Sequence, residues 1–200
     1  MRVRTDAKRS DIMDVAASVF LEQGFARTSM SEIAARLGGS KTTLYGYFRS
    51  KEDLFVEVVV AEAGKQLLPA FEELDENADL RDALVPIGEK LVAFLLSPDA
   101  LAAHRMVMSE AGRSNIGQHY YLSGRQRGIG LIAGFLERAS KIGKIQPCDF
   151  VIAATHLLAL IESEVLPPFH FGLARPAPSR LEIRQSTERA VDVFLRAYAT

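Results

Sequence analysis

The feature that most constrains the fold of this chain is a glycine pair, Gly38-Gly39, between two short amphipathic segments. The segment before it, SEIAARL, carries apolar residues at the spacing of one helix face. The glycines supply the backbone freedom that a tight turn requires. Ser40 is a favourable N-cap for a second helix over about residues 40–47, in which Leu44 and Phe48 recur at i, i+4. This pattern predicts a helix-turn-helix.

The second predicted helix carries polar groups opposite Leu44 and Phe48. At 100° per residue, the centre of that side is Thr42, Thr43 and Gly46, flanked by Lys41, Tyr45 and Tyr47. A cation, two hydroxyls and two phenols on a slim helix suit the major groove of DNA. The same composition is typical of any solvated amphipathic helix, and helix-turn-helix pairs also occur in all-α proteins with no nucleic-acid role.

The charge distribution favours nucleic acid at the amino-terminal end. Residues 1–51 carry a formal charge of +4 and the remaining residues −5, which gives the −1 of the whole chain. Arg2, Arg4, Lys8 and Arg9 open an amphipathic first helix that is predicted to end at Gly24. Ser50 is a suitable cap for the next helix and places Lys51 near its start, where free N–H groups favour phosphate.

Residues 28–55, TSMSEIAARLGGSKTTLYGYFRSKEDLF, resemble the amino-terminal signature of the TetR family of bacterial repressors. The matching positions are Thr28, Ile33, Ala34, Gly38, Ser40, Thr43, Leu44, Tyr45, Tyr47, Phe48, Lys51, Glu52 and Leu54. The resemblance and the groove-facing side together give the predicted DNA-binding set: Thr28, Ser31, Ser40, Lys41, Thr42, Thr43, Tyr45, Gly46, Tyr47 and Lys51.

Two glycines depart from the family pattern. Gly39 replaces a small apolar residue such as Val, so we expect a turn that is looser by up to about 1 kcal/mol. Gly46 replaces a larger, often polar or aromatic residue. We expect closer backbone approach to DNA at Gly46, with discrimination between sequences resting mainly on Lys41, Thr42 and Thr43.

Beyond residue 51 the apolar period stays helical, so the sequence predicts an all-α fold of about nine helices. It divides into a three-helix helix-turn-helix head, residues 1–51, and a helical ligand-binding and dimerisation body, residues 52–200. A bend or break is expected near Leu68. Helix ends are expected at Ser97-Pro98, at Gly112, at Gly143 and at Pro167-Pro168, with a last helix starting at Ser179 or Arg180. The longest body helix is expected over residues 117–142, with Gly128, Gly130 and Gly134 allowing close helix packing.

The composition is that of an ordinary globular protein, with 48% hydrophobic and 24% charged residues among 200. We expect neither a membrane-spanning helix nor a signal peptide, because apolar runs stay below about 18 residues and the charged start has no apolar segment behind it. A cytoplasmic location follows as an expectation. The single cysteine, Cys148, excludes an intrachain disulfide.

The last two helices carry more apolar residues than one side of a small body buries. The resemblance implies a homodimer in which these helices form a four-helix bundle with their twofold mates. Two recognition helices would then lie about 34–36 Å apart and read a near-palindromic operator. The alternative is that both helices are simply core. The predicted dimer residues are Val151, Leu158, Ile161, Val191, Phe194, Leu195 and Tyr198.

The resemblance also implies a small apolar or amphipathic effector, bound between the connecting helix and the middle helices, that releases the DNA. The predicted lining is Phe94, Leu95, Met106, Met108, Tyr120, Phe135, His156 and Phe169. Residues of these types more commonly pack in a core. No cofactor is implied.

Signatures of catalysis are missing from the sequence. It contains no G-x-S-x-G, G-x-x-x-x-G-K-[ST] or H-E-x-x-H motif. His104, His119, His156 and His170 lack the spacing of metal ligands. We therefore predict a homodimeric repressor, neither an enzyme nor a metalloprotein, that a ligand releases from a palindromic operator. An activator with the same head, and an all-α ligand-binding protein with a vestigial head, remain alternatives.

Overall fold

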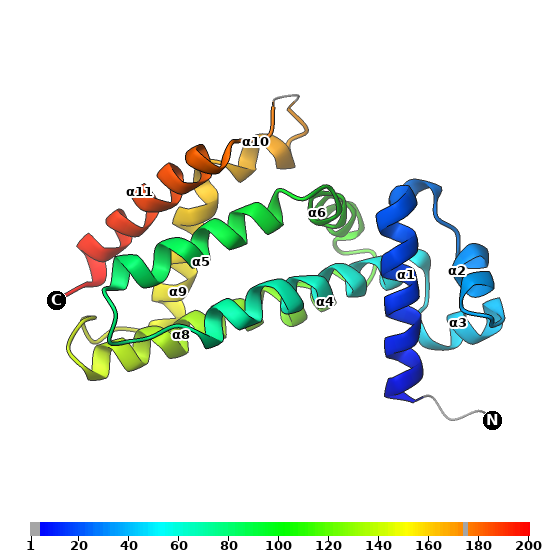
Figure 1. The fold of residues 1–200 in the computed structure, drawn as a ribbon, viewed down its shortest axis with the longest axis horizontal. Coiled ribbons are helices and arrows are strands. Elements are labelled where there is room, and N and C mark those ends of the chain that lie inside the picture. Colours follow the sequence, from blue (N-terminus) through cyan, green and yellow to red (C-terminus); the bar gives the residue numbers. More distant parts are fainter. Residues whose placement is uncertain (1–4, 174–175) are drawn as a thin grey trace. The chain divides into compact units, whose positions relative to one another are not determined.

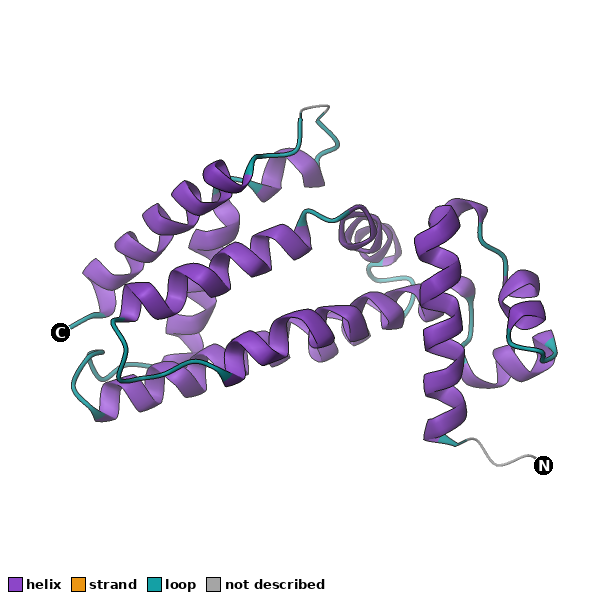
Figure 2. Cartoon of the chain, viewed as in Figure 1, coloured by secondary structure: helices purple, strands orange, loops and turns teal. Residues whose placement is uncertain are grey.

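The structure is a computed structural model that describes residues 5–173 and 176–200 (Figure 1). Most of these residues lie in helices, and the described part adds one isolated antiparallel bridge between Ile145 and Ala199 (Figure 2). The predicted all-α fold class is confirmed.

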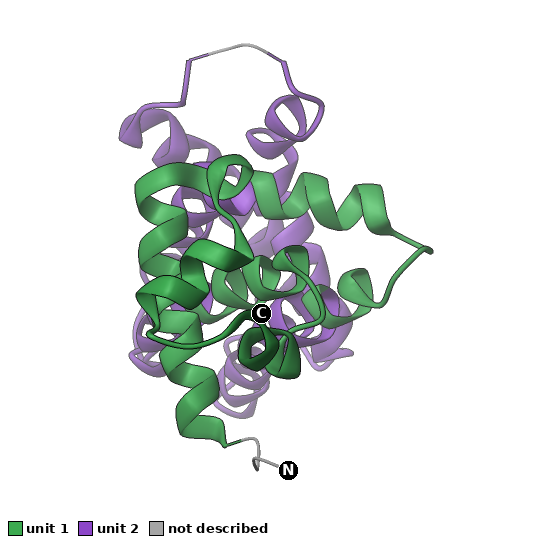
Figure 3. Ribbon diagram, turned by 90° about the vertical axis from the view of Figure 1, so that its right-hand side faces the viewer, with its two compact units in different colours: residues 1–62, 102–120 green, residues 63–101, 121–200 purple. Residues whose placement is uncertain are grey.

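The chain divides into two compact units, which Figure 3 distinguishes by colour. The head unit comprises residues 1–62 and 102–120, and the body unit comprises residues 63–101 and 121–200. The head unit therefore extends beyond the predicted boundary at residue 51. It takes in the first part of a long helix and a segment that is distant in the sequence.

The head unit begins with α1 (Asp6–Arg27), α2 (Met30–Arg36) and α3 (Lys41–Tyr47), followed by the start of α4 (Lys51–Glu72). It also includes the later part of α6 (Pro98–Glu110) and all of α7 (Ile116–Tyr120). These bounds confirm the predicted helix-turn-helix and place the second helix within one residue of the expected limits.

Local sequence explains the starts of the three head helices. Thr5, Ser29 and Ser40 are N-caps whose hydroxyl oxygens each accept the backbone N–H three residues on. The turn between α2 and α3 uses Gly38 at φ +65°, which a side chain would strain. Helical geometry in α1 is interrupted at Gly24, with φ 74° and ψ 164°, at the predicted end of that helix.

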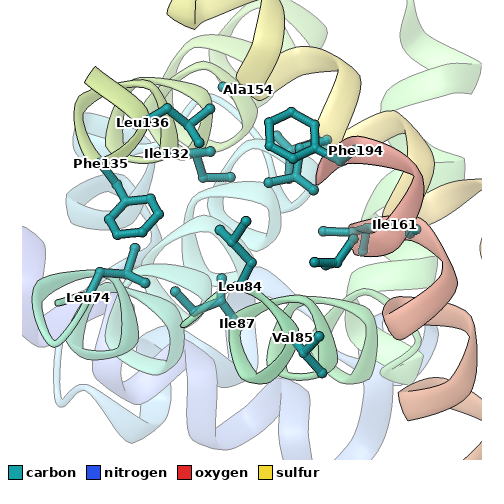
Figure 4. Packing of buried hydrophobic residues seen from close by; sticks show 14 of the residues in the cluster. Leu74, Leu84, Val85, Ile87, Ile132, Phe135, Leu136, Ala154, Ile161 and Phe194 are labelled. Atoms are coloured by element: carbon teal, nitrogen blue, oxygen red, sulfur yellow. The ribbon is translucent and has the colours of Figure 1, made fainter. Parts of the chain in front are cut away.

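The body unit packs α5 (Leu80–Leu95), α8 (Gln126–Lys141), α9 (Phe150–Ser163) and α11 (Arg180–Tyr198) around one hydrophobic core. Figure 4 shows side chains of this core, including Phe135 and Phe194, converging from these helices. The short α10 (Leu166–His170) follows α9. Ser179 caps α11 reciprocally with Glu182, as a capping box.

Three predicted helix limits need correction. Of the bend or break expected near Leu68, a break is wrong, because α4 continues past Gly64 and Pro69 to Glu72. The expected helix over residues 117–142 is divided into α7, a π-helical turn at Tyr121–Arg125 and α8. Pro167-Pro168 lies in the first turn of α10, where the missing N–H groups have no helical partner to lose.

The glycines of α8 do not have the packing role that we predicted. A Cβ at Gly128 or Gly130 would have no neighbour within 4 Å. Close packing occurs instead at Gly88 in α5, where a Cβ would lie 2.4 Å from Thr187 Cγ2 and 3.2 Å from Ile161 Cδ1. The backbone of α5 therefore approaches α11 at Gly88.

In the described part of the chain, no single helix is long and apolar enough to span a membrane. Helices α5 and α6 meet that criterion only when taken together, across a bend of 70°.

Candidate nucleic-acid interface

Helix α3 separates its buried and exposed residues as its sequence predicts. Leu44 and Phe48 are fully buried, whereas the side chains of Lys41, Thr42 and Tyr45 are exposed. Burial of Leu44 and the adjoining Phe48 fixes the helix against the head core. The opposite side is left free to enter a DNA groove.

Gly46 lies on the same side of α3 as the exposed residues. A Cβ at this position would have no atom within 4 Å outside the adjoining backbone. The fold therefore does not require glycine here. The surface at Gly46 is open, which fits the expectation that DNA could approach the backbone closely.

Thr43 is half-buried and bonded within the helix start. Its backbone N–H donates to Ser40 Oγ at 3.1 Å, and its own Oγ1 lies 3.0 Å from that oxygen. The two hydroxyls therefore form one polar group at the beginning of α3. Ser31, in α2, is exposed.

Lys41 differs from the other cations in the first part of the head unit, residues 5–62. Residues 5–62 contain seven Lys or Arg side chains, and Lys41 is the one that makes no hydrogen bond, ion pair or ring contact with another described residue. The partners of the other six are Asp11 for Lys8, Glu57 for Arg9, the Gln23 carbonyl for Arg27, Glu22 for Arg36, Asn115 for Arg49 and two carbonyls for Lys51. The positive charge of Lys41 is thus available to a phosphate or base. Arg2 and Arg4, also expected near DNA, lie outside the described residues.

Three members of the predicted DNA-binding set have their polar groups engaged inside the head. Thr28 is 3% exposed and its Oγ1 donates to the Gly24 carbonyl at 2.9 Å, so its side chain does not reach the surface as predicted. The Tyr47 hydroxyl accepts the Thr5 N–H at 3.2 Å. Lys51 Nζ donates to the carbonyls of Phe25 and Thr28. For Tyr47 and Lys51, sequence reasoning missed these roles because the partners lie 23 to 42 residues away in the sequence. For Thr28 the partner is only four residues away, but it accepts a hydrogen bond at the break in α1 that Gly24 makes.

Ion pairs connect α1 to two neighbouring helices of the head. Arg36 of α2 binds Glu22 of α1, with Arg36 Nη1 donating to Glu22 Oε1 at 2.7 Å. This hydrogen bond is the main reason that the pKa of Glu22 lies below its usual value. Arg9 of α1 pairs with Glu57 of α4, and His119 Nε2 lies 3.8 Å from the same carboxylate.

The predicted dimer residues are mostly internal. Leu158, Ile161, Val191 and Phe194 are 5% exposed or less and belong to the body core, so they do not form a surface for a second chain as predicted. Leu195 and Tyr198 are half-buried against the same core, and Val151 is exposed. Periodicity identified apolar residues on both helices but did not reveal which of them face inward.

Other apolar residues of α9 and α11 are exposed. Val151 and Ile152 on α9, and Leu181 and Val193 on α11, each expose half or more of their surface. Ile152, Leu181 and Val193 were absent from the predicted set. Leu181 and Val193 stand next to charged residues, a weaker signal than an apolar run, whereas Ile152 lies in the apolar run of residues 150–154, where periodicity does not show which residues face outward.

The predicted ligand-lining residues do not share one environment. Met106 and Tyr120 pack on Val56, Val107 and Ile116 in the head unit. Met108 is also in the head unit but is 62% exposed. In the body unit, Phe135 is fully buried in the core, and His156 is exposed with Nδ1 2.6 Å from the Tyr198 hydroxyl. Phe94, Leu95 and Phe169, also in the body unit, are half-buried.

Among the described residues, no three His, Cys, Asp or Glu side chains gather in a way that could hold a metal ion. Cys148 is a free, half-buried thiol. Burial raises the pKa of this thiol, with a smaller contribution from neighbouring Asp149, so the reactive thiolate is disfavoured.

Comparison with known proteins covers both units. Residues 12–58 match the family described as bacterial regulatory proteins, tetR family, and residues 82–200 match the C-terminal domain of AefR-like transcriptional repressors. The Bacillus subtilis (strain 168) fatty acid metabolism regulator protein is 25% identical over 160 residues, which are 79% of this chain and 81% of that protein.

Two solved structures resemble almost the entire chain. A TetR-family transcriptional regulator from Mesorhizobium loti MAFF303099 is 28% identical with a TM-score of 0.81, and the likeness covers 98% of this chain and 100% of that one. The flavonoid-responsive regulator FrrA is 32% identical with a TM-score of 0.71, covering 98% of each chain. With a helix-turn-helix head, an all-α body and matches to both family domains, the chain belongs to the TetR family of DNA-binding transcriptional regulators.

Proposed function

We propose that this regulator is a homodimeric repressor that binds a near-palindromic operator through α3. It leaves the operator when a small apolar or amphipathic molecule binds the body. The observation that carries this proposal is the exposed side of α3, on which Lys41 has no partner among the described residues. A cation without an intramolecular partner gives up no ion pair when it binds DNA.

The proposed reading residues are those that the exposed side of α3 offers to a groove. Lys41 and Thr42 supply a cation and a hydroxyl for base edges, and Tyr45 supplies a phenol for the phosphate backbone. Ser31 and Ser40 are exposed nearby in the sequence and suit phosphate contacts. Gly46 would let the helix backbone lie close to the DNA.

The operator can be identified by selection from a random pool of duplexes with the purified wild-type protein. We expect a near-palindromic sequence whose half-sites are one helical turn apart. Affinity for that duplex should fall by about 10³ between 50 and 200 mM salt if the dimer makes about six phosphate contacts. Failure to enrich any sequence would contradict the proposal.

For the dimer, we propose a surface formed by the exposed apolar residues Val151 and Ile152 of α9 and Leu181 and Val193 of α11. These four residues are the exposed large hydrophobic side chains of the two helices expected to pair. Ile152→Glu and Val193→Glu should each convert the dimer to a monomer in analytical ultracentrifugation. The control, Met108→Glu, alters an equally exposed apolar residue on α6 and should leave the dimer intact.

The proposed effector class is supported by the kinds of regulator that this chain resembles. FrrA is described as flavonoid-responsive, and the Bacillus subtilis relative regulates fatty acid metabolism. Flavonoids and long-chain fatty acids are therefore the first probes. A molecule of the right class should raise the melting temperature of the free protein and release it from the selected duplex.

The direction of regulation requires a reporter gene placed behind the selected operator. Co-expression of the regulator should lower reporter output, and addition of the effector should restore it. A rise in output on co-expression would instead identify an activator with the same DNA-reading head. A body that binds a probe without any change in DNA affinity would support the ligand-binding alternative.

A further inference from the structure

Lys51 is the first residue of α4, and its ammonium group is held by the junction between α1 and α2. Nζ donates to the Phe25 carbonyl at 2.9 Å and to the Thr28 carbonyl at 3.0 Å. The same nitrogen lies 4.0 Å from the centroid of the Phe25 ring. An ammonium has three N–H donors, so two of the three are used inside the head.

The two carbonyls lie where regular helix ends. Helical geometry in α1 breaks at Gly24, and the Thr28 side chain turns back to donate to the Gly24 carbonyl. Carbonyls at a helix end lack intrahelical donors and carry the negative end of the helix dipole. A lysine ammonium satisfies both their hydrogen-bonding capacity and their charge.

The position of these carbonyls connects Lys51 to the reading helix. Thr28 directly precedes Ser29, which caps α2, and α2 continues through a short turn into α3. Alongside, the Phe25 ring packs 4.9 Å from that of Phe55 in α4. Lys51 thus links the first turn of α4 to the segment that directly precedes the helix-turn-helix.

We propose that Lys51 is a positioning residue for DNA recognition. It sets how α2 and α3 are held on α4 and contacts no phosphate itself. Two of the three N–H donors are held by carbonyls, and any movement of the ammonium toward a phosphate would leave these two partly buried carbonyls without a donor. Lys41, which has no such partners, is the contrasting cation. This inference rests on the proposed DNA-reading role of α3.

The test compares full-length Lys51→Met, Lys51→Arg and Lys41→Met with the wild type. Dissociation constants are measured by fluorescence anisotropy on the selected operator duplex and on a scrambled duplex, from 50 to 200 mM salt. All measurements are made at a temperature at which circular dichroism shows each variant to be folded. The ratio of the two dissociation constants reports positioning, because partial unfolding would weaken both by the same factor.

We expect Lys51→Met to bind the operator roughly tenfold more weakly, with unchanged affinity for the scrambled duplex and the salt dependence of the wild type. Lys51→Arg should lose discrimination similarly, because a planar guanidinium cannot replace a compact ammonium between two carbonyls and a ring. Lys41→Met should instead make the slope of the logarithm of the binding constant against the logarithm of the salt concentration shallower, by about 0.9 for each phosphate that the protein no longer neutralises.

Two results would overturn the inference. One is a reduced salt slope in Lys51→Met with wild-type behaviour in Lys51→Arg, which would identify a phosphate contact. The other is an equal loss on both duplexes, which would identify a purely structural residue. If Lys51→Met does not fold, Lys51→Arg decides, since wild-type discrimination in that variant would contradict positioning. Failure of the wild type to select any duplex would overturn the proposed function, and this inference with it.

Discussion

Two glycines that lie within helices, Gly46 in the head and Gly88 in the body, differ in how much space surrounds them. A Cβ at Gly88 would lie 2.4 Å from Thr187 Cγ2, whereas a Cβ at Gly46 would meet nothing within 4 Å. Glycine costs helix stability at both positions. At Gly88 the close approach of two helices leaves no room for a side chain, so the fold requires glycine there. At Gly46 the fold leaves room for a side chain, so a requirement for glycine would have to come from a bound partner such as DNA.

The largest effect is expected at Gly88. Gly88→Ala should destabilise the protein by about 3 kcal/mol, because the new methyl group overlaps Thr187 Cγ2 and crowds Ile161 Cδ1. Urea denaturation measures the loss. The double variant Gly88→Ala with Thr187→Ser removes the opposing methyl and should recover part of the stability. A single variant as stable as the wild type would end the distinction between the two glycines.

The next effect concerns the exposed side of α3. Lys41→Ala should weaken operator binding by about 2 kcal/mol and leave the free energy of unfolding unchanged, because Lys41 has no partner to lose among the described residues. Lys141→Ala removes an equally exposed lysine from α8 and is the matched control. Fluorescence anisotropy with the selected duplex is the measurement. Wild-type affinity in Lys41→Ala would remove α3 from the interface as we have assigned it.

A smaller change of opposite sign is expected at Gly46. Gly46→Ala should stabilise the protein by about 0.5–1 kcal/mol, because alanine favours helix and the space around its methyl group is open. Operator affinity should nevertheless fall, since the methyl would hold the backbone away from the bases. Paired denaturation and binding curves test both statements. Greater stability together with unchanged affinity would show that Gly46 is not needed for DNA approach.

The smallest effects come from two exposed ion pairs, Glu22–Arg36 in the head and Glu164–Arg189 in the body. In each, a hydrogen bond from the arginine lowers the pKa of the glutamate. A lowered pKa adds stability above the ordinary glutamate value, which is lost as the pH falls through about 4 and below. The difference in stability between the wild type and Glu22→Gln or Glu164→Gln should therefore be largest at pH 7 and shrink as the pH falls below about 4. Urea midpoints measured from pH 7 downward provide the comparison, and a difference that does not change with pH would point to lost packing.

Local chemistry made the head predictable. The residues that determine α3 lie close together in one stretch of sequence. They are the turn residue Gly38, the cap Ser40 and the i, i+4 pair Leu44 and Phe48. The partners of Lys51 were not predictable, because Phe25 and Thr28 lie more than twenty residues away and are brought close by folding alone.

The body shows a different limit of sequence reasoning. Helical periodicity located α9 and α11, yet it could not show that Leu158 and Val191 face the core while Ile152 and Val193 face outward. Which face is buried depends on the helices packed against it, and no local motif records that. The ligand-lining set was chosen by residue type alone, so its members lie in separate environments.

The π-helical turn at Tyr121–Arg125 makes the rotational position of the following helix depend on the number of residues in this stretch. It accommodates one more residue than a turn of α-helix, between α7, whose Ile116 packs with Val56 and Val107, and α8, whose Ile132 belongs to the body core. Deleting one residue would convert the turn to α-helix and rotate everything after it by about 100°. The inward stripe of α8 would then point elsewhere, so this turn tolerates substitution better than a change in length.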